Sequence, residues 1–69
     1  MSQTYIVQVG PACYLERLPV GCWTLSTGLN WAARFATREA AEVCVRTLHG
    51  TVWQPAFIRP DPLKREANV

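Results

Sequence analysis

The segment from Thr37 to Gly50, "TREAAEVCVRTLHG", constrains the fold most strongly, because it carries signals for both ends of one α-helix. Thr37 is a good N-cap residue, and Gly50 suits the left-handed conformation that often closes a helix. Between them, apolar residues recur at the i, i+3, i+4, i+7 spacing of one buried helix face. These residues are Ala41, Cys44, Val45 and Leu48. The pattern predicts one short amphipathic helix.

The segments around this helix are short, rich in β-branched and aromatic residues, and separated by turn residues. They predict strands at Thr4–Val9, Ala12–Leu18, Cys22–Ser26 and Thr51–Ile58. Trp31–Ala36 is predicted to be extended or loop-like, with Phe35 pointing inward. Pro55 cannot donate to a sheet ladder, so the last strand is predicted to be an edge strand or bulged.

These elements predict an α+β fold: a small antiparallel sheet of three to four strands with one α-helix packed on one face. The sheet is expected to supply the core residues Tyr5, Val7, Leu15, Phe35 and Val52. At 69 residues the chain is one domain, and 49% hydrophobic with 17% charged residues is a globular composition. We expect a domain over residues 1–59 and a flexible C-terminal tail over residues 60–69, where prolines and mixed charge replace apolar residues.

The N-terminus and the cysteines predict where the chain resides. "MSQTY" lacks the basic and apolar regions of a secretory signal, and no apolar run is long enough to span a membrane. Three cysteines are an odd number, which disfavours a disulfide framework. We therefore expect a protein of the host cell cytoplasm with reduced thiols.

Candidate catalytic and metal-binding residues are dispersed along the chain. Glu39 and Glu42 fall on the exposed helix face, and Cys44 and His49 do not share a helix face well. Catalysis needs such groups positioned together, and structural zinc sites usually use closely spaced ligand pairs. The gaps between the cysteines are too long for such pairs. The sequence therefore predicts no enzymatic activity, no metal and no cofactor.

Aromatic residues and arginines point instead to binding, because tryptophan, tyrosine and arginine most often anchor interfaces. The predicted partner-binding residues are Trp31, Arg34, Arg38, Trp53 and Arg46. Direct nucleic-acid binding is an alternative, but the net charge is only +2 and Glu39 and Glu42 interrupt the arginines. A third alternative is a homodimer, in which the exposed sheet face is the chain's own interface.

The order "YIVQVG…CYLERL…GCWTL…ARFATREAAEVCVRTL…VWQPAFI" resembles small accessory proteins of phages and mobile elements, over about residues 4 to 58. Its most specific part is "ARFATREAA", Ala33 to Ala41. Such proteins include anti-CRISPR inhibitors, which bind Cas proteins or surveillance complexes and block target DNA binding or cleavage. The resemblance implies a non-enzymatic protein-binding inhibitor of this kind, whose partner is a Cas protein or CRISPR complex of the host. The alternative function is a small nucleic-acid-binding accessory or regulatory protein.

Overall fold

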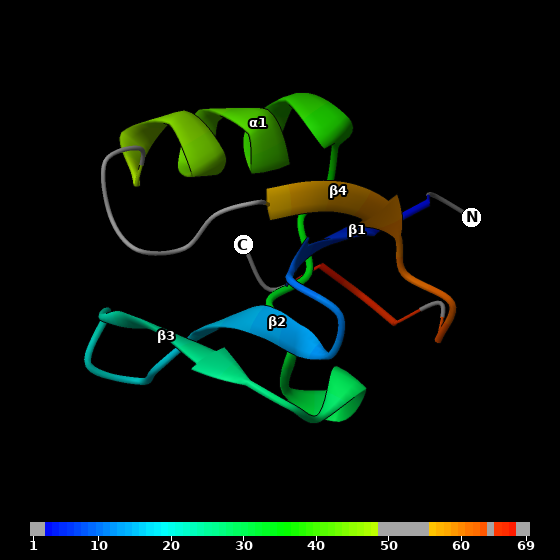
Figure 1. Ribbon diagram of the computed structural model, residues 1–69. Coiled ribbons are helices and arrows are strands. Elements are labelled where there is room, and N and C mark those ends of the chain that lie inside the picture. The colour runs from blue at the N-terminus through cyan, green and yellow to red at the C-terminus, as the bar shows by residue number, and fades with distance from the viewer. Residues whose placement is uncertain (1–2, 49–55, 64, 68–69) are drawn as a thin grey trace.

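The computed structural model describes residues 3–48, 56–63 and 65–67, which form a four-stranded antiparallel sheet and one α-helix (Figure 1). In chain order the elements are β1 (Tyr5–Val9), β2 (Cys13–Arg17), β3 (Trp23–Ser26), the 3-10 helix η1 (Leu29–Trp31), α1 (Arg38–Thr47) and β4 (Ala56–Pro60). The strand order is β3-β2-β1-β4, so the last strand lies beside the first. The predicted α+β fold class is confirmed.

The first three strands lie within their predicted ranges, but the fourth differs. It continues to Pro60, beyond the predicted end at Ile58. Most of the predicted strand, with Val52, Trp53 and Pro55, lies outside the described residues, so the expectations for these three stay predictions.

The helix begins where the sequence predicts. The Thr37 hydroxyl accepts a hydrogen bond from the Ala40 N–H at 3.0 Å, which satisfies one of the free donors of the first turn. Ala41 is fully buried, and the other residues of the predicted apolar face are partly buried against the core: Cys44, Val45 and Leu48. The predicted core face of the helix is therefore confirmed.

The strand registers decide which side chains face α1. Val7 pairs with Ile58, and Leu15 pairs with Leu25, so each pair points to the same side of the sheet. The main core cluster consists of Val7, Val9, Leu15, Ala33, Phe35 and Ala41. Ile6 points to the opposite side of the sheet, yet it is only 2% exposed. That side is therefore partly covered as well.

The chain between η1 and α1 passes between β1 and β2, as the green segment in Figure 1 shows. Phe35 and Tyr5 exchange two backbone hydrogen bonds of 2.8 and 2.9 Å, and the Ala33 N–H donates to the Leu15 carbonyl at 2.8 Å. Phe35 stacks on Trp23 with the ring centroids 6.1 Å apart. The extended segment with an inward Phe35 is confirmed, but its predicted first residue, Trp31, instead ends η1.

The segment after β4 makes more contacts than we expected of a flexible tail. The Asp61 N–H donates to the Thr4 carbonyl at 2.9 Å, and Asp61 is 1% exposed. Arg65 donates to two backbone carbonyls of η1. These contacts place the segment against the domain, while the division into residues 1–59 and a tail stays a prediction.

Candidate functional site

The structure does not gather the predicted partner-binding residues on one surface. Trp31 ends η1, whereas Arg38 begins α1 and Arg46 lies in its last turn. In Figure 1, η1 is the green turn below β2 and α1 lies at the top, with the strands between them. Arg34 belongs to the segment between η1 and α1, so it does not share a helix with Arg38 and Arg46. Trp53 lies outside the described residues.

Trp31 is the most exposed of the described aromatic residues, with 66% of its surface open to solvent. Its backbone position is fixed locally, because the Trp31 N–H donates to the Gly28 carbonyl at 3.0 Å. Its ring lies directly over Gly28. A Cβ atom at Gly28 would come within 2.7 Å of Cδ1 of Trp31, so only glycine fits beneath the ring in this position.

The Arg65 side chain donates hydrogen bonds to the backbone of η1. Its Nη1 donates to the Asn30 carbonyl at 2.6 Å, and its Nη2 donates to the Leu29 carbonyl at 2.9 Å. The Leu29 carbonyl also accepts from the Ala32 N–H at 3.1 Å, whereas the Asn30 carbonyl lies near the end of this short helix, where carbonyls lack intrahelical partners. A charged guanidinium is a strong donor to such groups. Arg65 therefore orders the backbone that carries Trp31.

Asp61 in turn positions Arg65. Its carboxylate Oδ1 accepts from the Leu63 N–H at 3.0 Å, and its Oδ2 accepts from the Thr4 hydroxyl at 3.4 Å. The Arg65 Nε lies 3.5 Å from the same Oδ2, an ion-pair distance rather than a hydrogen bond. We call Thr4, Asp61 and Arg65, with the η1 carbonyls that Arg65 contacts, the C-terminal clasp. It links the start, the middle and the end of the chain at one corner.

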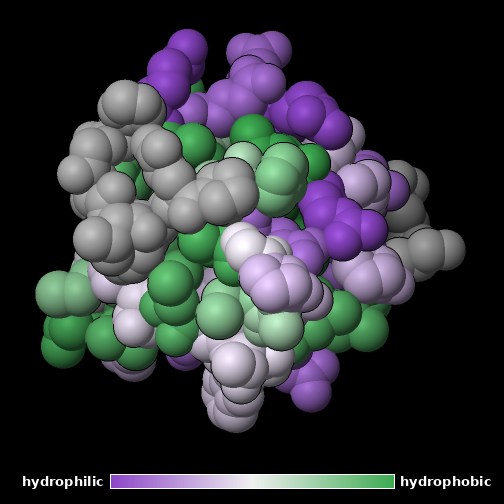
Figure 2. All heavy atoms as spheres, in the orientation of Figure 1, coloured by the Kyte–Doolittle hydropathy of each residue, from purple (hydrophilic) through white to green (hydrophobic). Residues whose placement is uncertain are grey.

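The other described arginines make contacts in different places. Arg34 Nε donates to the Glu66 carbonyl at 2.8 Å, close in sequence to the clasp. The Arg38 guanidinium lies over the Tyr5 ring at 5.8 Å, and that of Arg17 lies over Trp23 at 5.9 Å. Arg46 is exposed in the last turn of α1. Figure 2 shows hydrophilic residues gathered at the top of the molecule, where α1 lies. Arg17, Arg38 and Arg46 therefore lie on the α1 side of the sheet, and Arg34 is held by the segment after β4.

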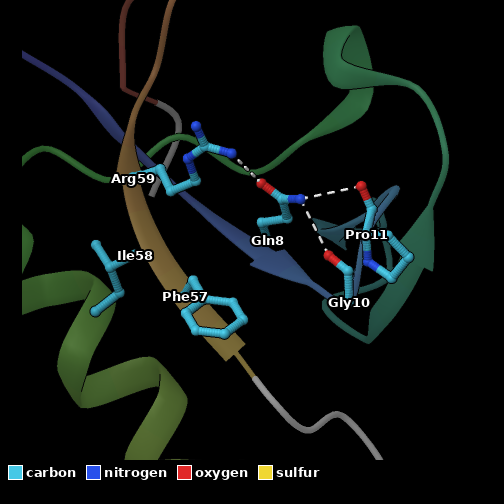
Figure 3. Close-up of a pocket in the computed structure, with 6 residues that line it drawn as sticks. All are labelled: Gln8, Gly10, Pro11, Phe57, Ile58 and Arg59. Atoms are coloured by element: carbon cyan, nitrogen blue, oxygen red, sulfur yellow. Dashed lines mark hydrogen bonds between the residues drawn. The ribbon is translucent and has the colours of Figure 1, made fainter.

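A second surface feature lies on the sheet face that points away from α1. Phe57 and Arg59 project there from β4, beside Gln8 of β1 and the β1–β2 turn (Figure 3). Together with Gly10, Pro11 and Ile58 they line an open hollow of about 660 Å³. Arg59 donates to the Gln8 side chain at 2.6 Å. Phe57 is 55% exposed, although it is a large apolar residue.

Sequence reasoning missed this hollow and the clasp. The alternation of Phe57 and Arg59 in "AFIRP" was a usable signal, because alternate residues of a strand share one face. The clasp had a weaker signal. Asp61 and Arg65 are four residues apart, but they follow a proline in a segment without regular periodicity.

The structure describes all three cysteines, and burial perturbs the thiol of Cys44. All three are free, Cys22 is exposed, and Cys13 and Cys44 are half-buried. Burial raises the pKa of the Cys44 thiol above its ordinary value of 9.0, and the positive charge of Arg17 offsets part of this effect. A raised pKa keeps the thiol in its unreactive protonated form. Within residues 3–48, 56–63 and 65–67, no group of three or more potential ligands could hold a metal ion.

Comparison with models of known protein families, with curated proteins and with solved structures finds no match to this chain. No helix in the described part of the chain is long and apolar enough to cross a membrane.

Proposed function

We propose that this chain is a non-enzymatic binding domain that uses Trp31 as its main anchor on a protein partner. The supporting observation is an exposed tryptophan on a corner that is already ordered. Trp31 is 66% exposed, while Gly28 and the clasp hold its backbone. Binding to a preordered side chain costs less conformational entropy than binding to a mobile one. Tryptophan is also among the residues that contribute most to protein interfaces.

Arg34 is the second residue that we propose for this interface, because its side chain bonds to Glu66, the chain neighbour of Arg65 in the clasp. It is half-buried and donates to the Glu66 carbonyl, so its aliphatic stem is held near the clasp. Of the five residues predicted from the sequence, Trp31 and Arg34 remain in this proposal. Arg38 and Arg46 belong to a different surface, on α1.

A protein partner fits these features better than a nucleic acid. Sequence-independent binding to nucleic acid requires arginines and lysines that together face the phosphates. In the described residues Arg17 and Arg38 lie over Trp23 and Tyr5 on the α1 side of the sheet, whereas Arg59 contacts Gln8 on the opposite side. A salt titration separates the two: a nucleic-acid binder loses affinity steeply as salt is added, whereas the proposed interface depends mainly on an apolar ring.

The narrower proposal is that the partner is a Cas protein or a CRISPR surveillance complex and that the chain inhibits it. Only the resemblance to phage and mobile-element accessory proteins supports this step. Its test is a plaque assay in bacteria that carry an active CRISPR system against the infecting phage. Expression of the chain should raise the plaque number, and expression of Trp31→Ala should not. Unchanged plaque numbers across strains with different CRISPR types would remove the narrower proposal and leave the broader one intact.

The broader proposal is tested by affinity. A partner captured from host lysate with the tagged chain is purified and titrated by calorimetry against wild type, Trp31→Ala and Val20→Ala. Val20 is a matched control, because it is an apolar residue that is 80% exposed on the turn between β2 and β3. Truncating the anchor should cost roughly 2 kcal/mol or more, about a 30-fold higher Kd. Equal affinities for wild type and Trp31→Ala would contradict the proposal.

A further inference from the structure

The outer edge of β4 is the second place where this domain can bind something. β4 is the last strand in the order β3-β2-β1-β4, and none of the described strands pairs with its outer side. In Figure 1 no other ribbon lies in front of β4. An open strand edge presents unpaired N–H and C=O groups, which makes it a template for another strand.

The hydrogen-bond pattern tells which groups face outward. In an antiparallel pair, the backbone groups of successive residues point alternately toward and away from the neighbouring strand. The Asp61 N–H donates to the Thr4 carbonyl, so the backbone groups of Asp61 point toward β1. By the same alternation, the backbone groups of Arg59 and Phe57 also point toward β1. The bonds between Tyr5 and Phe35 agree, since they point Tyr5 away from β4. The outward backbone groups are therefore those of Ala56, Ile58 and Pro60.

The outward edge is complementary to a second copy of itself. If two β4 strands pair antiparallel about Ile58, the two Ile58 residues can exchange both hydrogen bonds. Each Ala56 N–H then donates to a Pro60 carbonyl, while the Ala56 carbonyl receives no bond in return, because proline has no N–H. This register uses every outward residue of the strand.

The side chains of this register also complement one another. Phe57 of one copy lies directly opposite Arg59 of the second copy, on the face that points away from α1. Directly opposed side chains of antiparallel strands have Cβ atoms about 4.5–5.5 Å apart. A guanidinium over an aromatic ring is attractive, and no like charges meet. Moving the register by two residues toward the C-terminus would instead place Arg59 against Arg59.

We infer that β4 pairs with β4 of a second copy of this chain, giving a twofold dimer with one continuous sheet. This inference does not rest on the proposed function, because η1 and Trp31 lie beyond β2, at the other side of the sheet from β4 (Figure 1). In such a dimer both Trp31 corners stay accessible. The two exposed Phe57 rings are each covered by an arginine.

Light scattering of the full chain at increasing concentration tests the inference. Wild type should pass from monomer to dimer mass. Phe57→Lys and Phe57→Glu form a matched pair, since both remove the same exposed ring and differ in charge. Phe57→Lys places like charges opposite each other twice per dimer and should weaken it about tenfold, whereas Phe57→Glu gains two ion pairs with Arg59 and should dimerise at least as well as wild type.

The double variant Phe57→Lys with Arg59→Glu restores opposite charges and should recover the dimer that Phe57→Lys alone loses. Circular dichroism checks that each variant is folded. A wild type that stays monomeric at every concentration would overturn the inference, and so would equal weakening by Phe57→Lys and Phe57→Glu. Either result leaves the proposed role of Trp31 untouched.

Discussion

Two regions of this domain are held together by different forces. Beneath α1, Phe35 packs with Val7 and Ala41 in an apolar cluster from which water is excluded. At the corner formed by η1 and the segment after β4, the clasp holds the chain through Asp61 and Arg65. Packing in the apolar region contributes more to stability and does not depend on direction. The hydrogen bonds and the ion pair of the clasp contribute less, but they fix the positions of particular atoms. The first region therefore stabilises the fold, and the second orders the surface that we propose binds a partner.

The largest loss of stability should come from the apolar region. Phe35→Ala removes the ring that is buried between β1, β2 and Trp23. Such truncations cost about 3–5 kcal/mol, a large fraction of what a domain of this size has. Urea denaturation followed by circular dichroism measures the effect. Val20→Ala is the control, since this side chain is 80% exposed and belongs to neither proposed interface, so its loss should change the free energy of unfolding little. Similar losses for both variants would show that Phe35 is not a core residue.

The clasp should contribute less. Asp61→Ala leaves the Thr4 hydroxyl and the Leu63 N–H without their acceptor, and Arg65 without its ion-pair partner. Removing one partner of a buried hydrogen-bonded network costs about 1–3 kcal/mol. Hydrogen exchange should show faster exchange at η1 with little change in α1. Uniformly faster exchange across the domain would contradict the separation of the two regions.

Gly28→Ala tests the two regions separately, because it disturbs the position of the Trp31 ring and leaves the apolar cluster beneath α1 unchanged. The new methyl group would lie 2.7 Å from Cδ1 of Trp31, so the ring must move. Because the ring is mostly exposed and can yield, the cost should be about 1 kcal/mol, at the low end of overpacking. The emission spectrum of tryptophan should shift, while the melting temperature changes by a few degrees. An unchanged spectrum would mean that the ring does not rest on Gly28.

The smallest expected effect is on the pH dependence of stability, through Cys44 in the apolar region. Burial raises the pKa of the Cys44 thiol above 9.0, with the Arg17 charge opposing this shift. The unfolded thiol therefore ionises first, so the contribution of this group is complete below its unfolded pKa and is lost as pH rises through its folded pKa. Wild type should lose more stability than Cys44→Ala when pH rises above 9.0. Parallel stability curves for the two proteins would contradict the prediction.

The apolar region could be predicted from the sequence, and the clasp could not, for a physical reason. Thr37 and the Ala41–Leu48 face follow local rules of capping and periodicity, which the structure confirms. The bond from Arg65 to the Leu29 carbonyl joins residues 36 positions apart, and no local pattern specifies such a contact. For the same reason the residue type of Trp31 was enough to predict a binding role, which stays a prediction, but its separation from Arg38 required the fold.

The central claim is that the clasp orders the proposed binding surface around Trp31. It is tested most directly by measuring the affinity of the purified partner for Arg65→Ala and for Trp31→Ala. Arg65 orders the η1 carbonyls, and Trp31 is the proposed contact residue, so both variants should bind more weakly than wild type. Trp31→Ala should lose about 30-fold in Kd and Arg65→Ala about tenfold or less, because the ring itself is retained. Wild-type affinity for both variants would show that the binding surface lies elsewhere.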